Sequence, residues 1–198
     1  MTSMTRRTLL AGLATLSLTR SADAALTPYR LEPKGTSVVF TFDLSGLAQS
    51  GTMPIQSADI RIDLANLANS RVKVELNVAK ARTKLPLARQ PMLSREVLDA
   101  ATYPTILFVS TKVQLGDGGR ISRGARITGD LTVRGVTRPI TLRADLYRKP
   151  GSAADSLDDL SIRLTGALNR HDFGASGYAD LVRDTVGLDI RAEIKRVG

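Results

Sequence analysis

The sequence predicts an all-β fold, and two features of its patterning indicate this class. Apolar and polar residues alternate with a period of two in eight separate segments, as they do in strands with one buried face. Stretches rich in glycine and aspartate, residues 116–124 and 149–159, predict hairpin loops between some of them. Eight strands with a single apolar face can bury that face in a sandwich of two sheets or in a closed barrel.

The clearest strand pair is the stretch GDLTVRGVTRPITL, residues 129–142. Its alternation is interrupted by a short hinge and then resumes, which predicts two half-buried strands joined by a tight turn. The alternating segments are 38–44, 60–64, 72–78, 106–110, 127–133, 140–146, 162–168 and 186–194.

One segment, residues 91–104 (PMLSREVLDAATYP), departs from this pattern. Its apolar residues between Met92 and Leu98 have the spacing of a short helix, and Pro104 ends the segment before the next strand. A single short helix among eight strands is unusual for an immunoglobulin-like sandwich. It fits better as a lid or plug beside the mouth of a barrel.

The first 24 residues predict an export signal. Arg6 and Arg7 precede an apolar run, and Ala22-Asp23-Ala24 matches a small-x-small cleavage site. The run is too short to cross a bilayer, which needs roughly 20 residues, and no later segment is long and apolar enough for a membrane helix. The paired arginines resemble the twin-arginine form of the signal. Cleavage near Ala24 would leave one periplasmic domain, residues 25–198; a retained anchor or a cytosolic amphipathic start is the alternative.

The composition excludes several classes of function. The net charge is +9, and removal of residues 1–24 takes away three arginines and one aspartate, which leaves +7. The basic residues are scattered along the chain, so the charge favours solubility and some attraction to anionic head groups over nucleic-acid binding. The absence of cysteine excludes disulfides, thiol catalysis and thiolate metal sites. We therefore expect no cofactor, no metal and no nucleic-acid partner.

The sequence contains little evidence of a catalytic site. His171 is the only histidine, and its place between Arg170 and Asp172 predicts a structural or surface role. Asp59 and Asp63 are expected on a solvated strand face as surface charges. No serine lies in a Gly-x-Ser-x-Gly context. A binding module is therefore a better hypothesis than an enzyme, and a closed barrel of eight strands has the size that holds one small ligand.

At this point the sequence resembles a known family. The stretches that carry the resemblance, in this order, are YRLEPKGTSVVFTF, ATYPTILFVST, GDLTVRGVTRPITL, NRHDFG and VGLDIRAEI. Together they look like the YceI-like family of exported, lipocalin-like barrels. The most specific parts are Tyr-Pro-x-Ile-x-Phe at 103–108 and Gly-x-Leu-Thr-x-x-Gly-Val-Thr-x-Pro at 129–139. The resemblance covers residues 29–195, nearly all of the chain that follows the export signal.

The resemblance implies an eight-stranded antiparallel lipocalin-like barrel with one or two short helices, and no catalytic residues. It also implies a periplasmic protein whose elongated apolar cavity binds a polyisoprenoid or a similar amphiphile. The function expected is therefore a carrier for an isoprenoid-type lipid, such as a polyprenyl phosphate or a quinone-like lipid. The alternative is a non-catalytic structural or stress-response barrel with no dedicated ligand. Association into a homodimer is left open.

On this view the inward faces of the strands would line the cavity. The residues expected there are Phe40, Phe42, Ile62, Val74, Leu76, Phe108, Leu131, Val133, Ile140, Leu142, Leu188 and Ile190. The same pattern is also typical of an ordinary packed core, so both readings stand for the phenylalanines. Lys84, Arg89 and Arg95, near the expected helix, are candidates for contact with an anionic head group.

The sequence departs from the family pattern at three places around the expected mouth. Asp43-Leu44 stands where a histidine is usual, and Met53 stands near a usual aromatic position. RQPML, residues 89–93, replaces an acidic residue and a histidine. We expect these substitutions to affect which head group the protein accepts and not to affect the fold.

Overall fold

The computed structural model describes residues 26–116, 123–148, 151 and 156–198. The strands are β1 (Leu26–Leu44), β2 (Leu47–Thr52), β3 (Ile55–Asp63), β4 (Arg71–Asn77), β5 (Arg82–Thr83), β6 (Thr105–Leu115), β7 (Ala125–Val133), β8 (Val136–Arg148), β9 (Asp159–Asn169) and β10 (Thr185–Arg196). The one α-helix in these residues is α1 (Arg89–Leu93), and 3-10 turns form η1 (Leu67–Asn69), η2 (Pro86–Ala88) and η5 (Arg170–Phe173).

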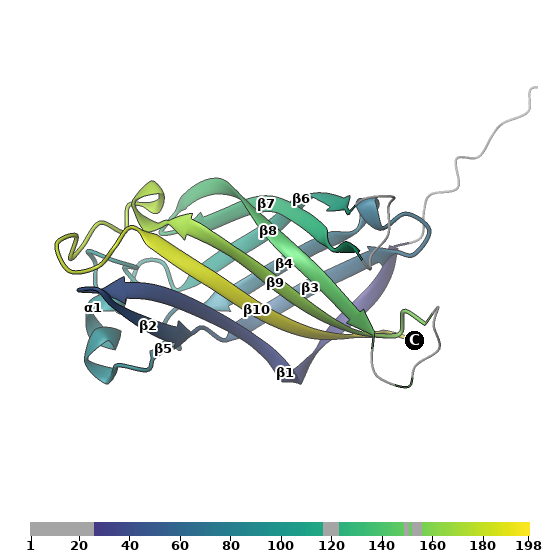
Figure 1. Ribbon diagram of the computed structural model, residues 1–198, viewed down its shortest axis with the longest axis horizontal. Helices are drawn as coiled ribbons and strands as arrows, with labels where there is room; N and C mark the ends of the chain where they lie inside the picture. The colour runs from purple at the N-terminus through teal and green to yellow at the C-terminus, as the bar shows by residue number, and fades with distance from the viewer. Residues whose placement is uncertain (1–25, 117–122, 149–150, 152–155) are drawn as a thin grey trace, which may run out of the picture.

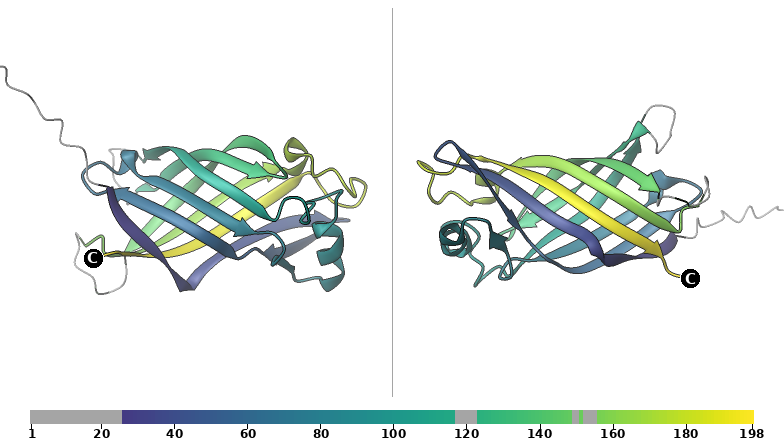
Figure 2. Two further views of the ribbon diagram at one scale, coloured as in Figure 1. Left: turned by 180° about the vertical axis from the view of Figure 1, so that it is seen from behind. Right: turned by 60° about the horizontal axis from the view of Figure 1, so that its bottom comes forward.

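The strands form one antiparallel sheet that closes on itself (Figures 1 and 2). Their order is β10-β9-β8-β7-β6-β4-β3-β1-β2-β5, and an additional pairing of β10 with β1 completes the barrel. Each of the eight alternating segments of the sequence lies in a different barrel strand, except that Leu64 and Val78 are one residue beyond the ends of β3 and β4. The predicted eight-stranded antiparallel barrel with one or two short helices is therefore confirmed, and the sandwich is excluded.

Strand β1 makes the closure possible because it bends in the middle (Figure 1). Its register with β10 shifts between Glu32 and Ser37. At the bend Gly35 has φ +88°, and a Cβ there would lie 2.7 Å from Cγ of Glu193. The first half of β1 pairs with β3 and the second half pairs with β2. Strands β2 and β3 therefore follow one another along the same side of β1 and together occupy one strand position of the barrel.

Strand β2 is not among the eight predicted segments, and the composition of β2 explains why. Residues 47–52 read LAQSGT and have no sustained alternation. The segment is a strand because six of its residues pair in register with β1, from Leu44↔Leu47 to Val39↔Thr52. Pairing with a long neighbouring strand thus outweighs a weak local pattern.

The hairpin in GDLTVRGVTRPITL is confirmed. Strands β7 and β8 pair down to Val133↔Val136 and are joined by Arg134 and Gly135, with φ of 51° and 73°. Positive φ at both central residues is the geometry of a type I′ turn, which matches the twist of the flanking strands. The turn lies at the same end of the barrel as α1, because Nη2 of Arg134 donates to the carbonyl of Arg95 at 2.9 Å.

The helix expected within residues 91–104 is shorter and earlier than predicted. It ends at Leu93, because Ser94 is extended (ψ 166°) and Asp99 has φ +46°. The backbone N–H of Leu98 donates to the carbonyl of Met92, and that of Ala100 to Leu93. The apolar residues of this segment therefore lie partly on α1 and partly on the turns that follow it, and not on one face of a single helix.

The expectation for Asp63 is also wrong. Asp59 is exposed, but Asp63 is only 1% exposed. Its Oδ1 accepts hydrogen bonds from the N–H groups of Ala65 and Asn66 at 2.9 and 2.8 Å, and its Oδ2 accepts one from Asn69 at 3.0 Å. The chain turns tightly after β3, and this turn leaves backbone N–H groups without a strand partner. The buried carboxylate accepts hydrogen bonds from them.

Some expectations fall outside the described residues. These include the export signal of residues 1–24 and most of the loops predicted at 116–124 and 149–159. Within the described part of the chain, no helix has the length and apolar character needed to span a membrane.

Candidate functional site

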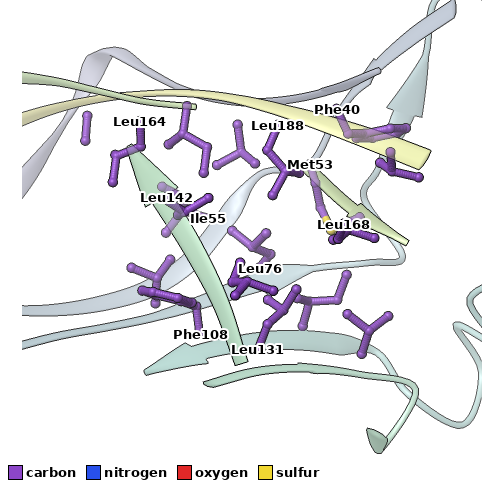
Figure 3. A pocket seen from close by; sticks show the side chains of 18 of the residues that line it. Phe40, Met53, Ile55, Leu76, Phe108, Leu131, Leu142, Leu164, Leu168 and Leu188 are labelled. Carbon is purple, nitrogen blue, oxygen red and sulfur yellow. The ribbon is translucent and has the colours of Figure 1, made fainter. Parts of the chain in front are cut away.

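An apolar cavity of about 570 Å³ lies inside the barrel (Figure 3). Eight strands, all except the short β2 and β5, contribute to its wall, since inward side chains alternate with outward ones along each strand. The cavity reaches Leu85, Leu87 and Met92 around η2 and α1 at one end. At the other end it reaches Leu115 and Leu157. It therefore runs along the length of the barrel.

Two packed clusters lie toward the two ends of the barrel. One contains Val78, Val133 and Phe173, and the other contains Tyr29 and Ile194. Between them several inward side chains, such as Phe40, Val74 and Leu188, are only half-buried although the barrel surrounds them. Because protein interiors normally leave few voids larger than a water molecule, this retained accessibility marks room for a guest.

The wall of the cavity is almost entirely hydrocarbon. Among its lining residues, only Ser70, Arg170 and Tyr178 carry a polar side chain. The side chains drawn in Figure 3 show carbon and one sulfur, that of Met53. Such a wall can hold an apolar chain by burial of its surface, but it offers few groups to orient a polar substrate.

All twelve residues expected to line the cavity lie in its wall. Phe40, Leu76, Phe108, Leu131, Leu142 and Leu188 are visible together in Figure 3. The phenylalanines thus border open space rather than a filled core. Whether these residues touch a ligand stays a prediction.

The three head-group candidates do not lie in the cavity wall. Lys84 and Arg95 are exposed on the outside of the barrel end. Arg89 is half-buried, and its Nε and Nη2 donate to the carbonyls of Ala81 and Ala79 at 3.0 and 2.8 Å. Arg89 therefore ties α1 to the chain before β5. Contact of these three residues with a head group stays a prediction.

Arg170 is a residue of the site that sequence reasoning did not single out. It is 5% exposed and borders the cavity. Its guanidinium donates to four carbonyls, those of Ala175, Gly177, Val182 and Arg183, at 2.6 to 3.2 Å. It thereby organises the loop between η5 and β10. The alternation pattern could not reveal this role, because in the sequence Arg170 is one more basic residue at a strand end.

The end of the barrel that holds α1 is also where the cavity meets the surface. Leu87, Tyr178 and Leu181 border the cavity, yet they are 83%, 45% and 51% exposed. The loop between η5 and β10 lies beside the tip of β1 here, since the N–H of Ser45 donates to the carbonyl of Leu181 at 2.7 Å. We call this end the mouth.

His171 lies outside the cavity wall. It is exposed on η5, and its Nε2 is 3.2 Å from Oδ1 of Asp184. Its backbone N–H donates to the side chain of Asn169, which caps the 3-10 turn. This position agrees with the surface role expected for it.

Comparison with known proteins identifies relatives along nearly the whole chain. The family model for the YceI-like domain matches residues 29–194. A UPF0312 protein of Pseudomonas savastanoi pv. phaseolicola (strain 1448A / Race 6) is 30% identical over 195 residues, which is 96% of this chain and 97% of the relative.

Solved structures agree in fold. The crystal structure of Burkholderia cenocepacia BcnA superposes with a TM-score of 0.71 at 17% identity, over 83% of this chain and 99% of BcnA. A polyisoprenoid binding domain from Saccharophagus degradans, implicated in plant cell wall breakdown, gives a TM-score of 0.61 at 13% identity, over 86% and 99% of the two chains. At these identities the likeness shows the barrel architecture alone.

Proposed function

This chain belongs to the YceI-like family, and from that premise we propose that it binds an isoprenoid-type lipid and carries it in the periplasm. The observation that carries the proposal is the hydrocarbon-lined cavity inside the closed barrel. The similarity in fold to a domain described as polyisoprenoid-binding supports the choice of ligand class. The periplasmic setting rests on the export signal predicted for residues 1–24.

The size and chemistry of the cavity suit such a tail. Its volume of about 570 Å³ falls within the range of roughly 300–1,000 Å³ usual for small-molecule sites. Burial of one five-carbon unit contributes on the order of 3–4 kcal/mol, at about 0.8 kcal/mol for each CH₂-sized group. Two or three units can therefore give micromolar binding after the entropic cost of association is subtracted.

The cavity wall also bears on how the ligand is oriented. A charged head group would lose its hydration inside a wall made of leucine, isoleucine, valine and phenylalanine. We therefore place the tail inside the barrel and the head group at the mouth, where Leu87, Tyr178 and Leu181 reach solvent. This arrangement accepts a quinone or a polyprenyl phosphate equally. It assigns no chemical step to the protein, which we propose to be non-catalytic.

Native mass spectrometry of the protein purified from the periplasm tests this proposal directly. We expect a discrete added mass that is released by organic solvent and identified as an isoprenoid. Protein freed of lipid should take up added ubiquinone or undecaprenyl phosphate. A clean apo mass together with no uptake of either lipid would overturn the carrier function. That result would instead favour the alternative, a structural or stress-response barrel without a dedicated ligand.

A further inference from the structure

We propose that the mouth of the barrel docks on an anionic lipid bilayer through residues 79–95, which we call the basic segment. The segment contains β5, η2 and α1. In this orientation Leu87 enters the interface between head groups and acyl chains, while the surrounding cations contact lipid phosphates. The proposal goes beyond the binding of a cargo lipid, because it names a second surface and a different partner.

Charge is the first observation that carries the proposal. The basic segment contains Lys80, Arg82, Lys84, Arg89 and Arg95 and no acidic residue. It is therefore an exception to the scattered placement of basic residues along the rest of the chain. All but Arg89 are exposed. Clusters of four to eight basic residues in a short stretch of chain are typical of contact with anionic lipid, and each contributes at short range from the membrane surface.

The exposed charges of the basic segment form no ion pair with any residue that the structure describes. In the described part of the chain, none of the five forms an ion pair, in contrast to Lys73, Arg163 and Arg196. Arg71, Lys112 and Arg126, at the opposite end of the barrel, are also unpaired among the described residues, so they make a control that differs in position and not in pairing. An exposed cation without a carboxylate partner keeps more of its attraction for an external anion. Arg95 is the exception among the five, because the carboxylate of the adjacent Glu96 interacts with it.

Exposed apolar side chains are the second observation. Seven large apolar side chains are exposed among the described residues, and four of them, Leu47, Leu87, Tyr178 and Leu181, lie around the mouth. Leu87, within the basic segment, is the most exposed of the seven, at 83%. An exposed leucine flanked by lysine and arginine is the composition of a segment that lies in a membrane interface.

The basic segment is also held in place before any membrane contact. The backbone N–H of Lys84 donates to the carbonyl of Ser50 at 2.9 Å, and the hydroxyl of Thr83 donates to the carbonyl of Leu85 at 2.6 Å. Arg89 anchors its other end through the two carbonyl contacts described above. A surface that is already ordered loses little conformational entropy on docking.

Docking in this orientation would have a direct consequence for transfer of cargo. Leu85, Leu87, Pro91 and Met92 belong to the basic segment and also line the cavity. A bilayer in contact with the segment would therefore face the opening of the cavity. A hydrocarbon tail could then pass between bilayer and barrel with little exposure to water.

Co-sedimentation with vesicles tests the role of charge. We expect the purified protein to bind vesicles of 30% phosphatidylglycerol in phosphatidylcholine and not vesicles of phosphatidylcholine alone. The variant Lys80→Gln/Arg82→Gln/Lys84→Gln should lose on the order of 100-fold in partition coefficient, at about fivefold per basic residue. Raising the salt to 1 M should release the unmodified protein, because the Debye length falls to about 3 Å.

The matched control carries the same change in net charge at the opposite end of the barrel. Arg71, Lys112 and Arg126 are exposed and lie on the outside of β4, β6 and β7. The variant Arg71→Gln/Lys112→Gln/Arg126→Gln should keep its vesicle binding within a fewfold of the unmodified protein. Equal losses in the two triple variants would mean that only the net charge matters, and would overturn the proposal.

A fluorescence measurement tests the orientation independently. The chain has no tryptophan, so Leu87→Trp and, as a control on the outer wall, Val109→Trp each introduce a single reporter. We expect a blue shift and quenching by brominated lipid for Leu87→Trp only. Absence of both signals, or the same signals at Val109→Trp, would contradict docking through the mouth.

These vesicles contain no isoprenoid, so the result is independent of the proposed cargo. Vesicle binding by a protein that takes up no isoprenoid would retain the docking surface and remove the carrier function. Isoprenoid uptake by a protein that does not bind anionic vesicles would retain the carrier function and remove the docking surface.

Discussion

The ring of Phe108 in β6 lies directly against the backbone of Gly129 in β7. A Cβ built on Gly129 would lie 2.5 Å from Cζ of Phe108 and 2.5 Å from the carbonyl oxygen of Val109. An aromatic ring that covers a bare glycine on the neighbouring strand fills space that a side chain would otherwise occupy. Since Phe108 also lines the cavity, Gly129 helps to set how far the ring projects into it.

The substitution Gly129→Ala should therefore destabilise the barrel. The added methyl group must displace either the ring or the backbone, and overpacking of this kind costs about 1–3 kcal/mol. Urea unfolding measures the loss, and lipid uptake should weaken because the ring is pushed into the cavity. Asp130→Ala, at the exposed neighbouring position, should change stability by no more than about 0.5 kcal/mol. Unchanged stability in Gly129→Ala would show that the contact relaxes freely.

The cavity can be filled from its own wall. Leu164 projects toward the cavity (Figure 3), so the indole of Leu164→Trp should occupy part of the space for the ligand. We expect at least a tenfold loss in affinity for ubiquinone, which corresponds to about 1.4 kcal/mol. Titration of the lipid-free protein with ubiquinone measures this affinity.

Ala167→Trp is the matched control for this variant. Ala167 lies on the same strand, β9, and is exposed outside the cavity wall. Uptake should remain unchanged in this protein. If both tryptophan variants bind ubiquinone like the parent, the ligand does not occupy the cavity at Leu164.

Removal of the Arg170 guanidinium should loosen the loop that borders the mouth. Arg170→Ala leaves four carbonyls without their donor, and loss of a buried partner costs about 1–3 kcal/mol per unsatisfied group, less where water replaces it. We expect an overall loss of about 3 kcal/mol in unfolding free energy. Hydrogen exchange should quicken in residues 175–183 while the barrel strands keep their protection.

Arg183→Ala serves as the comparison for Arg170. Its side chain is 77% exposed, and its Nε is 3.6 Å from Oδ1 of Asp43. An exposed ion pair contributes about 0–1 kcal/mol, so stability and exchange should change little. Comparable losses in both variants would show that Arg170 has no special part in holding the loop.

Asp63 predicts a dependence of stability on acid. The hydrogen bonds from Asn69, Asn66 and Ala65 hold the pKa of its carboxyl below the ordinary value of 3.8. A lowered pKa in the folded state stabilises the fold at pH values above the unfolded-state pKa. That contribution is lost as the pH falls through the folded-state pKa.

The difference in unfolding free energy between the parent and Asp63→Asn should therefore be present at pH 7 and shrink below about pH 4, near the unfolded-state pKa. Urea unfolding at several pH values measures it. Asn69→Ala removes the first of these hydrogen bonds and should raise the pH at which the contribution is lost. A difference that is constant down to pH 2 would exclude Asp63 as the group responsible.

Much of the fold was predictable because alternation is a local property. The inward sets such as Val38, Phe40 and Phe42 were correctly assigned from the residues alone, and so was the β7–β8 hairpin. The limits of α1 and the burial of Asp63 were not predictable. Both depend on turns that are closed by hydrogen bonds between residues several positions apart, and a period of two or 3.6 carries no signal for them.

By itself, the sequence determined that eight strands each have one apolar face, and therefore which side chains point inward. It did not determine whether those side chains pack against one another in a filled core or surround a cavity. That depends on the radius of the barrel, which follows from strand tilt and register. In this protein the bend of β1 between Glu32 and Ser37 and the register shift in β6 between Ser110 and Lys112 appear only in the pairing. The closed sheet leaves the inward side chains around open space, and it brings Arg170 and the basic segment to the same end of the barrel from distant parts of the chain.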